Sequence, residues 1–212
     1  MRIAIIGTGQ VGDALARGLS GRGHQVTLGA RTPQADQVTA LARQVGAAVA
    51  LPAAAAAGAE VVILALPWAA AEPAVRALGD LTGRIVIDCM NPIGRTAQGM
   101  GLTLGHSTSG GETVATWLPG AQVVKTLNQV GAEIMAHNDH LPHRPAMFMA
   151  GDSDAAKAKV PRLLADLGFD PLDAGDLTRS RLLEPLGMVW INQALMRGKG
   201  RHWALAAVEA PA

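Results

Sequence analysis

A glycine pattern close to the N-terminus limits the possible folds of this chain more than any other segment. Residues 7–12 read GTGQVG and match the pattern G-x-G-x-x-G, between an apolar strand-like run at 2–6 and a helical pattern at 11–20. Between a strand and a helix, such glycines bind the diphosphate of a dinucleotide. The pattern therefore predicts a βαβ unit of a parallel sheet at the start of the chain.

Each glycine of the pattern has its own task. Gly7 makes the tight turn after the strand, Gly9 lets the backbone approach the diphosphate, and Gly12 lets the helix pack closely on the strand. The first turn of the helix supplies free N–H groups and a partial positive charge to the phosphates. A glycine-rich turn without a ligand is the alternative. We expect the dinucleotide to be held by Gly7, Thr8, Gly9, Gln10, Val11 and Gly12.

The rest of the chain alternates between strand and helix patterns. Strands are predicted at 2–6, 25–28, 61–66, 85–88, 123–127, 146–150 and 169–172. Helices are predicted at 11–20, 33–45, 53–57, 69–78, 112–118, 155–167 and 182–196, and loops at 93–105 and 137–145. This alternation is typical of an α/β fold of the Rossmann type, with a doubly wound, mostly parallel sheet. We expect a single domain, 1–212, with a dinucleotide-binding core at 1–135 and a small, largely helical C-terminal appendage (a strand–helix extension) at 146–212.

The end of the second predicted strand decides between NAD and NADP. Sites for NAD place an Asp or Glu there to bind the ribose 2′-hydroxyl group. This chain reads LGART at 28–32 and has no carboxylate before Asp36. Arg31 is able to hold a 2′-phosphate through charge-assisted hydrogen bonds, and Thr32 is able to add another. NADP is therefore the predicted cofactor, with a solvated surface arginine as the alternative interpretation of Arg31.

The composition excludes several classes of protein. Hydrophobic residues make up 49% and charged residues 17%, which is typical of a globular chain. The formal net charge of +1 provides no general attraction to nucleic acid or to an anionic membrane. The single cysteine, Cys89, excludes an internal disulfide and fits a reducing compartment. The strand pattern at 2–6 leaves no room for a signal peptide, so we expect a cytoplasmic protein.

The chain has no tyrosine, and this limits its chemistry. Short-chain dehydrogenases and aldo-keto reductases use a tyrosine as proton donor, so both classes are excluded. None of the candidate lysines resembles the helix-borne lysine of hydroxyacid dehydrogenases; these are Lys125, Lys157, Lys159 and Lys199. We therefore predict no catalytic side chain. This scarcity of acids and bases favours hydride transfer between two rings, where the protein provides the positioning.

Histidines recur at every third position in a polar segment, as His137, His140 and His143. Such a set could suggest a metal site. The segment also contains Pro142 and Pro145, so helical geometry cannot align the imidazoles. We expect a solvated loop and no metal.

Several short segments spread along the chain share their residues with one known family. They read GTGQVG at 7–12, GAR at 29–31, LPW at 66–68, VVK at 123–125, PLDAG at 171–175 and SRLLE at 180–184. With them the chain resembles, nearly end to end, the NADPH-dependent reductases of coenzyme F420 (8-hydroxy-5-deazaflavin), the F420:NADP oxidoreductases. It is also similar to the reductase domain of six-transmembrane ferric reductases. The last segments are the most specific, because a generic Rossmann enzyme has no reason to carry them.

The resemblance implies roles for residues outside the glycine pattern. It places Pro67 and Trp68, together with Leu66, beside the nicotinamide half of the cofactor. We expect Asn91 to lie there too, and a slot lined by Trp68, Asn91 and Asn128 to hold the second substrate. The family has Ser-Arg-Arg where this chain has Ala-Arg-Thr at 30–32, and a histidine where this chain has Asn128. The first departure implies weaker binding of the 2′-phosphate, and the second leaves the identity of the second substrate undecided.

The sequence thus predicts an NADPH-dependent oxidoreductase that moves a hydride between NADP(H) and a deazaflavin- or flavin-like acceptor. A non-catalytic NADP(H)-sensing module is the main alternative, and an open pocket beside the nicotinamide would favour the enzyme. Ferric chelates or small imines are the alternative substrates. The predicted helix 182–196 carries more apolar surface than one sheet face can cover, which suggests a homodimer. Arg181 and Glu184 are spaced for an ion pair along that helix.

Overall fold

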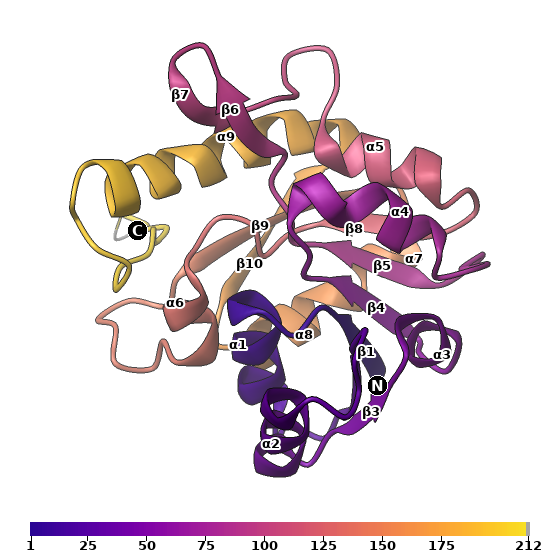
Figure 1. Cartoon of the computed structure of the whole chain (residues 1–212). Helices are drawn as coiled ribbons and strands as arrows, with labels where there is room; N and C mark the ends of the chain where they lie inside the picture. Colours follow the sequence, from indigo (N-terminus) through magenta and orange to yellow (C-terminus); the bar gives the residue numbers. More distant parts are fainter. Residues whose placement is uncertain (211–212) are drawn as a thin grey trace.

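A single sheet forms the centre of the computed structural model, which describes residues 1–210 (Figure 1). Its strands are β1 (Arg2–Ile6), β2 (Gln25–Gly29), β3 (Ala48–Ala50), β4 (Val61–Leu64), β5 (Ile85–Asp88), β8 (Gln122–Lys125), β9 (Ala146–Gly151) and β10 (Asp170–Gly175). They follow the order β10-β9-β8-β5-β4-β1-β2-β3. The part from β3 to β8 has the 3-2-1-4-5-6 order of doubly wound dinucleotide folds. Within the described residues β8 and β9 pair antiparallel and the other neighbours in this sheet pair parallel, so the predicted mostly parallel Rossmann-type sheet is confirmed.

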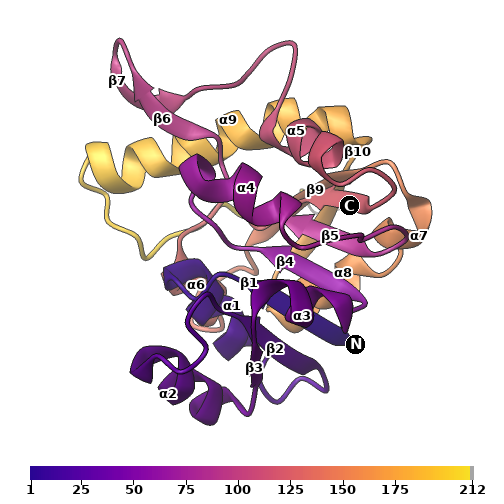
Figure 2. The ribbon, with the colours of Figure 1, turned by 45° about the vertical axis from the view of Figure 1, so that its right-hand side comes forward.

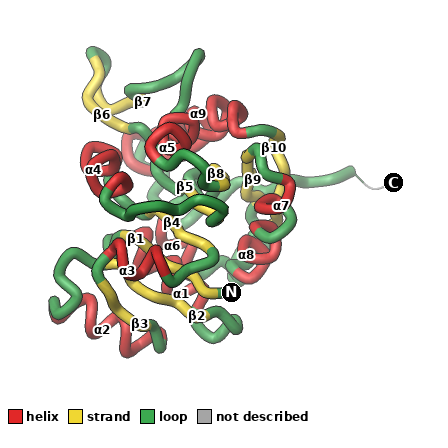
Figure 3. The backbone as a smooth tube through the Cα atoms, turned by 90° about the vertical axis from the view of Figure 1, so that its right-hand side faces the viewer, coloured by secondary structure: helices red, strands yellow, loops and turns green. Residues whose placement is uncertain are grey.

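Helices cover both faces of the sheet (Figures 2 and 3). They are α1 (Gln10–Leu19), α2 (Asp36–Val45), α3 (Pro52–Ala57), α4 (Ala71–Arg76), α5 (Gly110–Trp117), α6 (Ala132–Ala136), α7 (Asp154–Lys157), α8 (Val160–Asp166) and α9 (Ser180–Ile191). The sheet has a buried apolar cluster on each face, and successive residues of a central strand pack into one cluster and then the other. In β1, Ile3 and Ile5 pack with α1, whereas Ala4 and Ile6 pack with α3 and α4. Burial on both faces explains why these strands are continuous apolar runs in the sequence.

The segment 93–105, predicted as a loop, contains a hairpin, so that prediction is wrong. Strands β6 (Ile93–Thr96) and β7 (Gly99–Leu102) pair antiparallel and form a separate two-stranded sheet. Gly99 turns the chain with a positive φ of 107°, and the Thr96 hydroxyl donates a hydrogen bond to its carbonyl at 2.9 Å. The hairpin extends from the body of the molecule beside α9 (Figure 1).

Other element boundaries differ from the predictions for local reasons. The predicted helix 155–167 is divided into α7 and α8, with Pro161 in the first turn of α8, where its missing N–H group is not needed. The predicted helix 182–196 begins two residues earlier, as α9, and ends in a π-helical turn, Asn192–Met196. Neither β3 nor α6 was predicted, because both are short. Within residues 1–210, none of the helices combines the length and the hydropathy that a membrane span requires.

Candidate functional site

The turn after β1 has the geometry that its glycines predict. Gly7 has φ 106°, and a Cβ atom built on it would lie 2.4 Å from the carbonyl oxygen of Ala65. A Cβ on Gly12 would lie 1.9 Å from the carbonyl oxygen of Gly7. A Cβ on Gly9 would meet no atom within 4 Å. Gly7 and Gly12 are therefore required by packing, whereas Gly9 leaves its backbone open to an incoming ligand.

The first turn of α1 starts at this glycine turn. Gly9 occupies the N-cap position, and no side chain within residues 1–210 accepts a cap hydrogen bond from the first turn. The turn lies between β1 and β4, where the strand order reverses, and parallel α/β sheets bind their ligands at such a point. Uncapped N–H groups beside a bare glycine backbone are able to bind phosphate groups.

Arg31 and Thr32 lie next to the glycine turn. The N–H group of Gly7 donates a hydrogen bond to the carbonyl of Gly29 at 3.1 Å, so the end of β2 adjoins the turn. Both side chains that follow are exposed. Among the described residues, Arg31 takes part in none of the ion pairs. Its guanidinium group is available to an anion at the edge of the site.

A cavity of about 190 Å³ lies where α1 meets the ends of β5 and β8. Its lining comes from three regions: the glycine pattern, the loops after β5 and β8, and the C-terminal part of the chain. The residues include Gln10, Val11, Cys89, Asn91, Asn128, Trp190 and Arg201. The cavity thus adjoins the glycine pattern and is bounded on one side by α9 and the segment that follows it.

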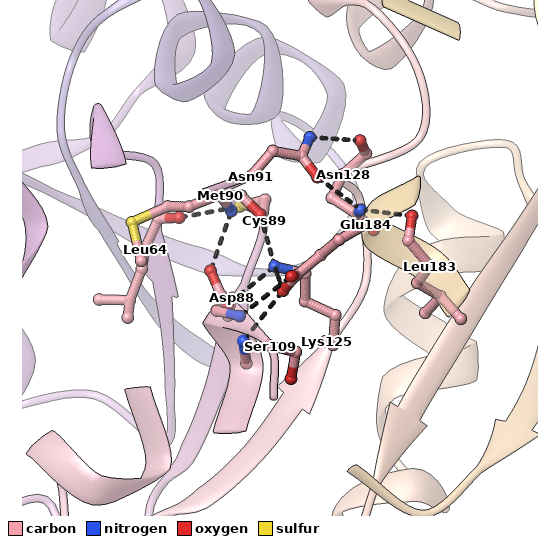
Figure 4. A network of polar contacts seen from close by, with 12 residues as sticks. Leu64, Asp88, Cys89, Met90, Asn91, Ser109, Lys125, Asn128, Leu183 and Glu184 are labelled. Atoms are coloured by element: carbon pink, nitrogen blue, oxygen red, sulfur yellow. Dashed lines mark hydrogen bonds and ion pairs between the residues drawn. The ribbon is translucent and has the colours of Figure 1, made fainter. Parts of the chain in front are cut away.

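Asn91 and Asn128 are joined by a reciprocal pair of hydrogen bonds (Figure 4). The Asn91 amide donates to the carbonyl of Asn128 at 2.8 Å, and the Asn128 amide donates to the Asn91 Oδ1 at 2.9 Å. The Asn128 Nδ2 also donates to the carbonyl of Leu183 on α9 at 3.0 Å, and its Oδ1 accepts from Gln129 at 3.0 Å. The Asn128 side chain therefore shapes the cavity wall, and its two amide hydrogens are already used.

Trp68 does not line the cavity that holds these two asparagines. It begins the 3-10 turn Trp68–Ala70, and its ring stacks on Trp117 of α5 with centroids 5.3 Å apart. Its neighbour Leu66 lies against the glycine turn, because its Cδ2 would be 3.2 Å from a Cβ on Gly7. Pro67 between them is exposed. The structure brings Asn91 and Asn128 together on one cavity, whereas Trp68 is not among the residues that line it.

A fully buried ion cluster lies behind the cavity (Figure 4). The Lys125 Nζ lies 3.0 Å from Asp88 Oδ2 and 2.9 Å from Glu184 Oε1, and it also donates to the carbonyl of Met90. Burial alone lowers the pKa of the Lys125 ammonium, but the two carboxylates outweigh it and hold that pKa above its usual range. The cluster connects β5, β8 and α9 and fixes the backbone next to Asn91.

Glu184 has partners other than the one that its spacing suggests. It accepts hydrogen bonds from the N–H groups of Gly110 and Gly111 at 3.0 Å each, at the start of α5. Arg181 instead donates to Glu112 of α5, with Nε 2.9 Å from Oε2, and this contact lowers the pKa of Glu112. The predicted ion pair between Arg181 and Glu184 is therefore wrong. A signal for the true pairing was present in the sequence, because a lysine within an apolar strand needs a buried acidic partner.

Cys89 is part of the cavity wall, and its thiol is unreactive. Its thiol donates a hydrogen bond to the carbonyl of Leu64 at 3.1 Å. Burial, reinforced by the nearby Asp88 carboxylate, raises the pKa of the thiol far above its usual range. Because the thiolate is the nucleophilic form, Cys89 does not act as a nucleophile here.

Comparisons with known proteins agree with this geometry. The family model described as "NADP oxidoreductase coenzyme F420-dependent" matches residues 2–92, from β1 to the loop that carries Asn91. A protein of solved structure from Arthrobacter sp. FB24, assigned as an F420-dependent NADP reductase, is 34% identical with a TM-score of 0.89. The match covers 99% of this chain and 100% of that one.

Two further relatives are more distant. Metalloreductase STEAP3 of Rattus norvegicus is 28% identical over 188 residues, which is 87% of this chain. The chain spans only 36% of the length of that protein. A reductive aminase from Aspergillus terreus, solved in complex with a nicotinamide cofactor, is 23% identical with a TM-score of 0.67. The match covers 93% of this chain and 62% of the aminase, and it shows a shared fold.

Proposed function

Because this chain belongs to the family of coenzyme F420-dependent NADP oxidoreductases, we propose that it transfers a hydride between NADP(H) and a deazaflavin- or flavin-like acceptor. The observation that carries this proposal is the cavity beside the glycine pattern, lined by Asn91 and Asn128. Gln10 and Val11 of the glycine pattern also line this cavity, so a nucleotide sensor would need it too, and the acceptor assays described below separate the enzyme from the sensor.

The residues present fit a dinucleotide. The open backbone at Gly9 and the uncapped first turn of α1 would hold the diphosphate, while Arg31 and Thr32 would hold the 2′-phosphate. The nicotinamide ring, which carries the hydride when NADPH is bound, would extend toward the cavity. Leu66 would contact the cofactor beside Gly7, and Pro67 and Trp68 would border it from the end of β4.

The chain's own contribution to the reaction is positioning. The amide groups of Asn91 and Asn128 are locked by their mutual hydrogen bonds, so they present a fixed wall to the two rings. Lys125 is fully buried behind that wall and is held by two carboxylates, so it is not available as a proton donor. A planar acceptor that manages its proton through its own ring nitrogens fits such a site best.

Replacing Arg31 with alanine is expected to weaken NADPH binding about tenfold or more and to leave NADH binding nearly unchanged. The lost interaction is a charged hydrogen bond to a group that only NADP carries, and such bonds contribute about 1.5–3 kcal/mol. Calorimetric titration of the variant with both nucleotides measures the difference. Arg43→Ala, an exposed arginine in the last turn of α2, is the control. Equal losses for NADPH and NADH would show that Arg31 does not contact the 2′-phosphate.

The acceptor is tested by steady-state assays of NADPH oxidation with a 5-deazaflavin, FMN, a ferric chelate, a cyclic imine and a simple ketone. We expect turnover with the deazaflavin, or otherwise with the flavin, and little or none with the ketone. Histidine is the commonest general acid, and His106 is exposed in the loop between β7 and α5. His106→Ala should change the rate little, because the proposed mechanism uses no side chain for general acid catalysis, which contributes a factor of about 10² to 10⁴. Imine reduction that depends on His106 or Lys125 would contradict this mechanism. Tight NADPH binding without turnover on any acceptor would favour the sensor.

Two details of the proposal rest on separate observations. Ferric chelates are the second candidate acceptor, because the relative from Rattus norvegicus is a metalloreductase.

A homodimer through α9 is supported by its outer face, where Leu182 is 62% and Val189 is 55% exposed. Exposed apolar side chains that gather on one helix are typical of a protein interface.

A further inference from the structure

We propose that Arg201, in the segment that follows α9, is a dinucleotide-binding residue whose guanidinium group is shared between Glu133 and the diphosphate of the bound nucleotide. The inference rests on the proposed function, because it places the nucleotide at the glycine turn. It adds a cationic side chain, far away in the sequence, to a diphosphate-binding turn otherwise built from backbone N–H groups. It also assigns a competing role to the carboxylate of Glu133.

The position of Arg201 is the first observation. Its Nη1 atom lies 3.2 Å from the Oε1 atom of Gln10, which belongs to the glycine pattern and begins α1. Arg201 and Gln10 line the same cavity. The arginine side chain remains 40% exposed. Its charge therefore lies beside the helix N-terminus that attracts phosphate, and it is accessible to a ligand.

The segment that carries Arg201 is anchored on both sides. Before it, the N–H of Gly200 donates to the carbonyl of Ala194 at 3.2 Å. After it, the ring of Trp203 stacks on Trp190 with centroids 5.8 Å apart, and the Trp190 indole donates to the Trp203 carbonyl at 3.0 Å. The fold thus returns the segment around Arg201 to the glycine turn, and the position of Arg201 is fixed by these contacts.

The present partners of Arg201 leave it with spare binding capacity. A guanidinium group has five N–H donors, and the contact with the Glu133 Oε1 is 3.4 Å, longer than the 2.7–2.9 Å of a strong charged hydrogen bond. The other oxygen of Glu133 is buried and has no hydrogen-bond partner among the described residues. A diphosphate, which accepts two parallel hydrogen bonds from arginine, is a stronger partner than this loose pair.

Opposite effects on nucleotide affinity follow for the two residues. Arg201→Gln should weaken NADPH and NADH by the same factor, about tenfold, because both nucleotides carry the diphosphate. Glu133→Gln should strengthen both a few-fold, because it removes a negative charge that competes for Arg201 and repels the phosphates. The affinity of the Arg201→Gln variant should also depend less on salt than that of the unchanged protein. Arg197→Gln, an exposed arginine of the same segment, should change nothing.

The experiment is calorimetric titration of the full chain with NADPH, NADH and 2′-AMP at two ionic strengths, with circular dichroism to verify folding. Because 2′-AMP lacks the diphosphate, it should lose affinity in Arg31→Ala and keep it in Arg201→Gln. If Arg201→Gln binds NADPH as tightly as the unchanged protein does, or if Glu133→Gln weakens binding, this inference is overturned while the proposed function stands. If the unchanged protein binds neither NADPH nor NADH, the proposed function itself fails.

Discussion

Replacing Gly9 with alanine is expected to abolish NADPH binding and to leave the protein folded. Gly9 has φ −77° and ψ −169°, which alanine adopts without strain, and its new Cβ would meet no protein atom within 4 Å. The methyl group would instead occupy the space through which the diphosphate approaches the backbone. Titration with NADPH measures the loss, and circular dichroism with thermal melting verifies the fold.

Two other glycines serve as controls for this experiment. A Cβ on Gly58 would have its nearest neighbours 3.9 Å away, so Gly58→Ala should change neither folding nor binding. Gly12→Ala should fail to fold normally, because its Cβ would be 1.9 Å from the Gly7 carbonyl oxygen. Unchanged NADPH affinity in a correctly folded Gly9→Ala variant would mean that the glycine turn is not the dinucleotide site.

Replacing Lys125 with methionine is expected to destabilise the protein by about 3–5 kcal/mol, the cost of removing one partner from a buried ion pair. The substitution leaves the carboxylates of Asp88 and Glu184, which are 0% and 1% exposed, without their counter-ion. Urea unfolding should show a lower midpoint with an unchanged slope. Since Lys125 also holds the Met90 carbonyl, the cavity wall at Asn91 should loosen as well.

A combined variant separates the charge from the packing in this cluster. Lys125→Met with Asp88→Asn and Glu184→Gln should recover much of the lost stability, because no buried charge remains unpaired. Arg76→Met, which breaks an ion pair with Glu72 that is more than half exposed, should cost less than about 1 kcal/mol. If Lys125→Met costs no more than Arg76→Met, the buried charges do not stabilise the fold.

The parts of the fold that were predictable are those that the core determines. Strands β1 and β5 have the predicted bounds, because burial on both faces makes them apolar runs, which end before Gly7 in β1 and at Asp88 in β5. The hairpin of β6 and β7 lies outside both apolar clusters, and with Gly94, Gly99 and Gly101 it has no alternating pattern to detect. Strand β3 is rich in alanine, and its pairing with β2 is what makes it a strand.

The candidate site was predictable where its residues are neighbours in the sequence. The glycine pattern is local, so the tasks of Gly7 and Gly12 follow from a few residues and agree with their packing. The hydrogen bond between Asn128 and Asn91 depends on the register in which β5 pairs with β8. A local sequence pattern does not predict that register. Trp68 was predicted to line the substrate slot because it follows Leu66 and Pro67 in the sequence. In the structure its ring stacks on Trp117 of α5, a helix much later in the chain.

The buried ion cluster also affects the order in which the molecule can mature during synthesis. The glycine turn and Asp88 leave the ribosome first, but the counter-ion of Asp88 is Lys125, 37 residues later, and Glu184 follows only with α9. A nascent chain that ends near Pro92 has the glycine pattern and Arg31, yet it would have to bury the Asp88 carboxylate without a counter-ion to close its core. We therefore expect Asp88 to stay exposed to solvent until β8 has been made, and α9 to complete the cluster that β5 begins.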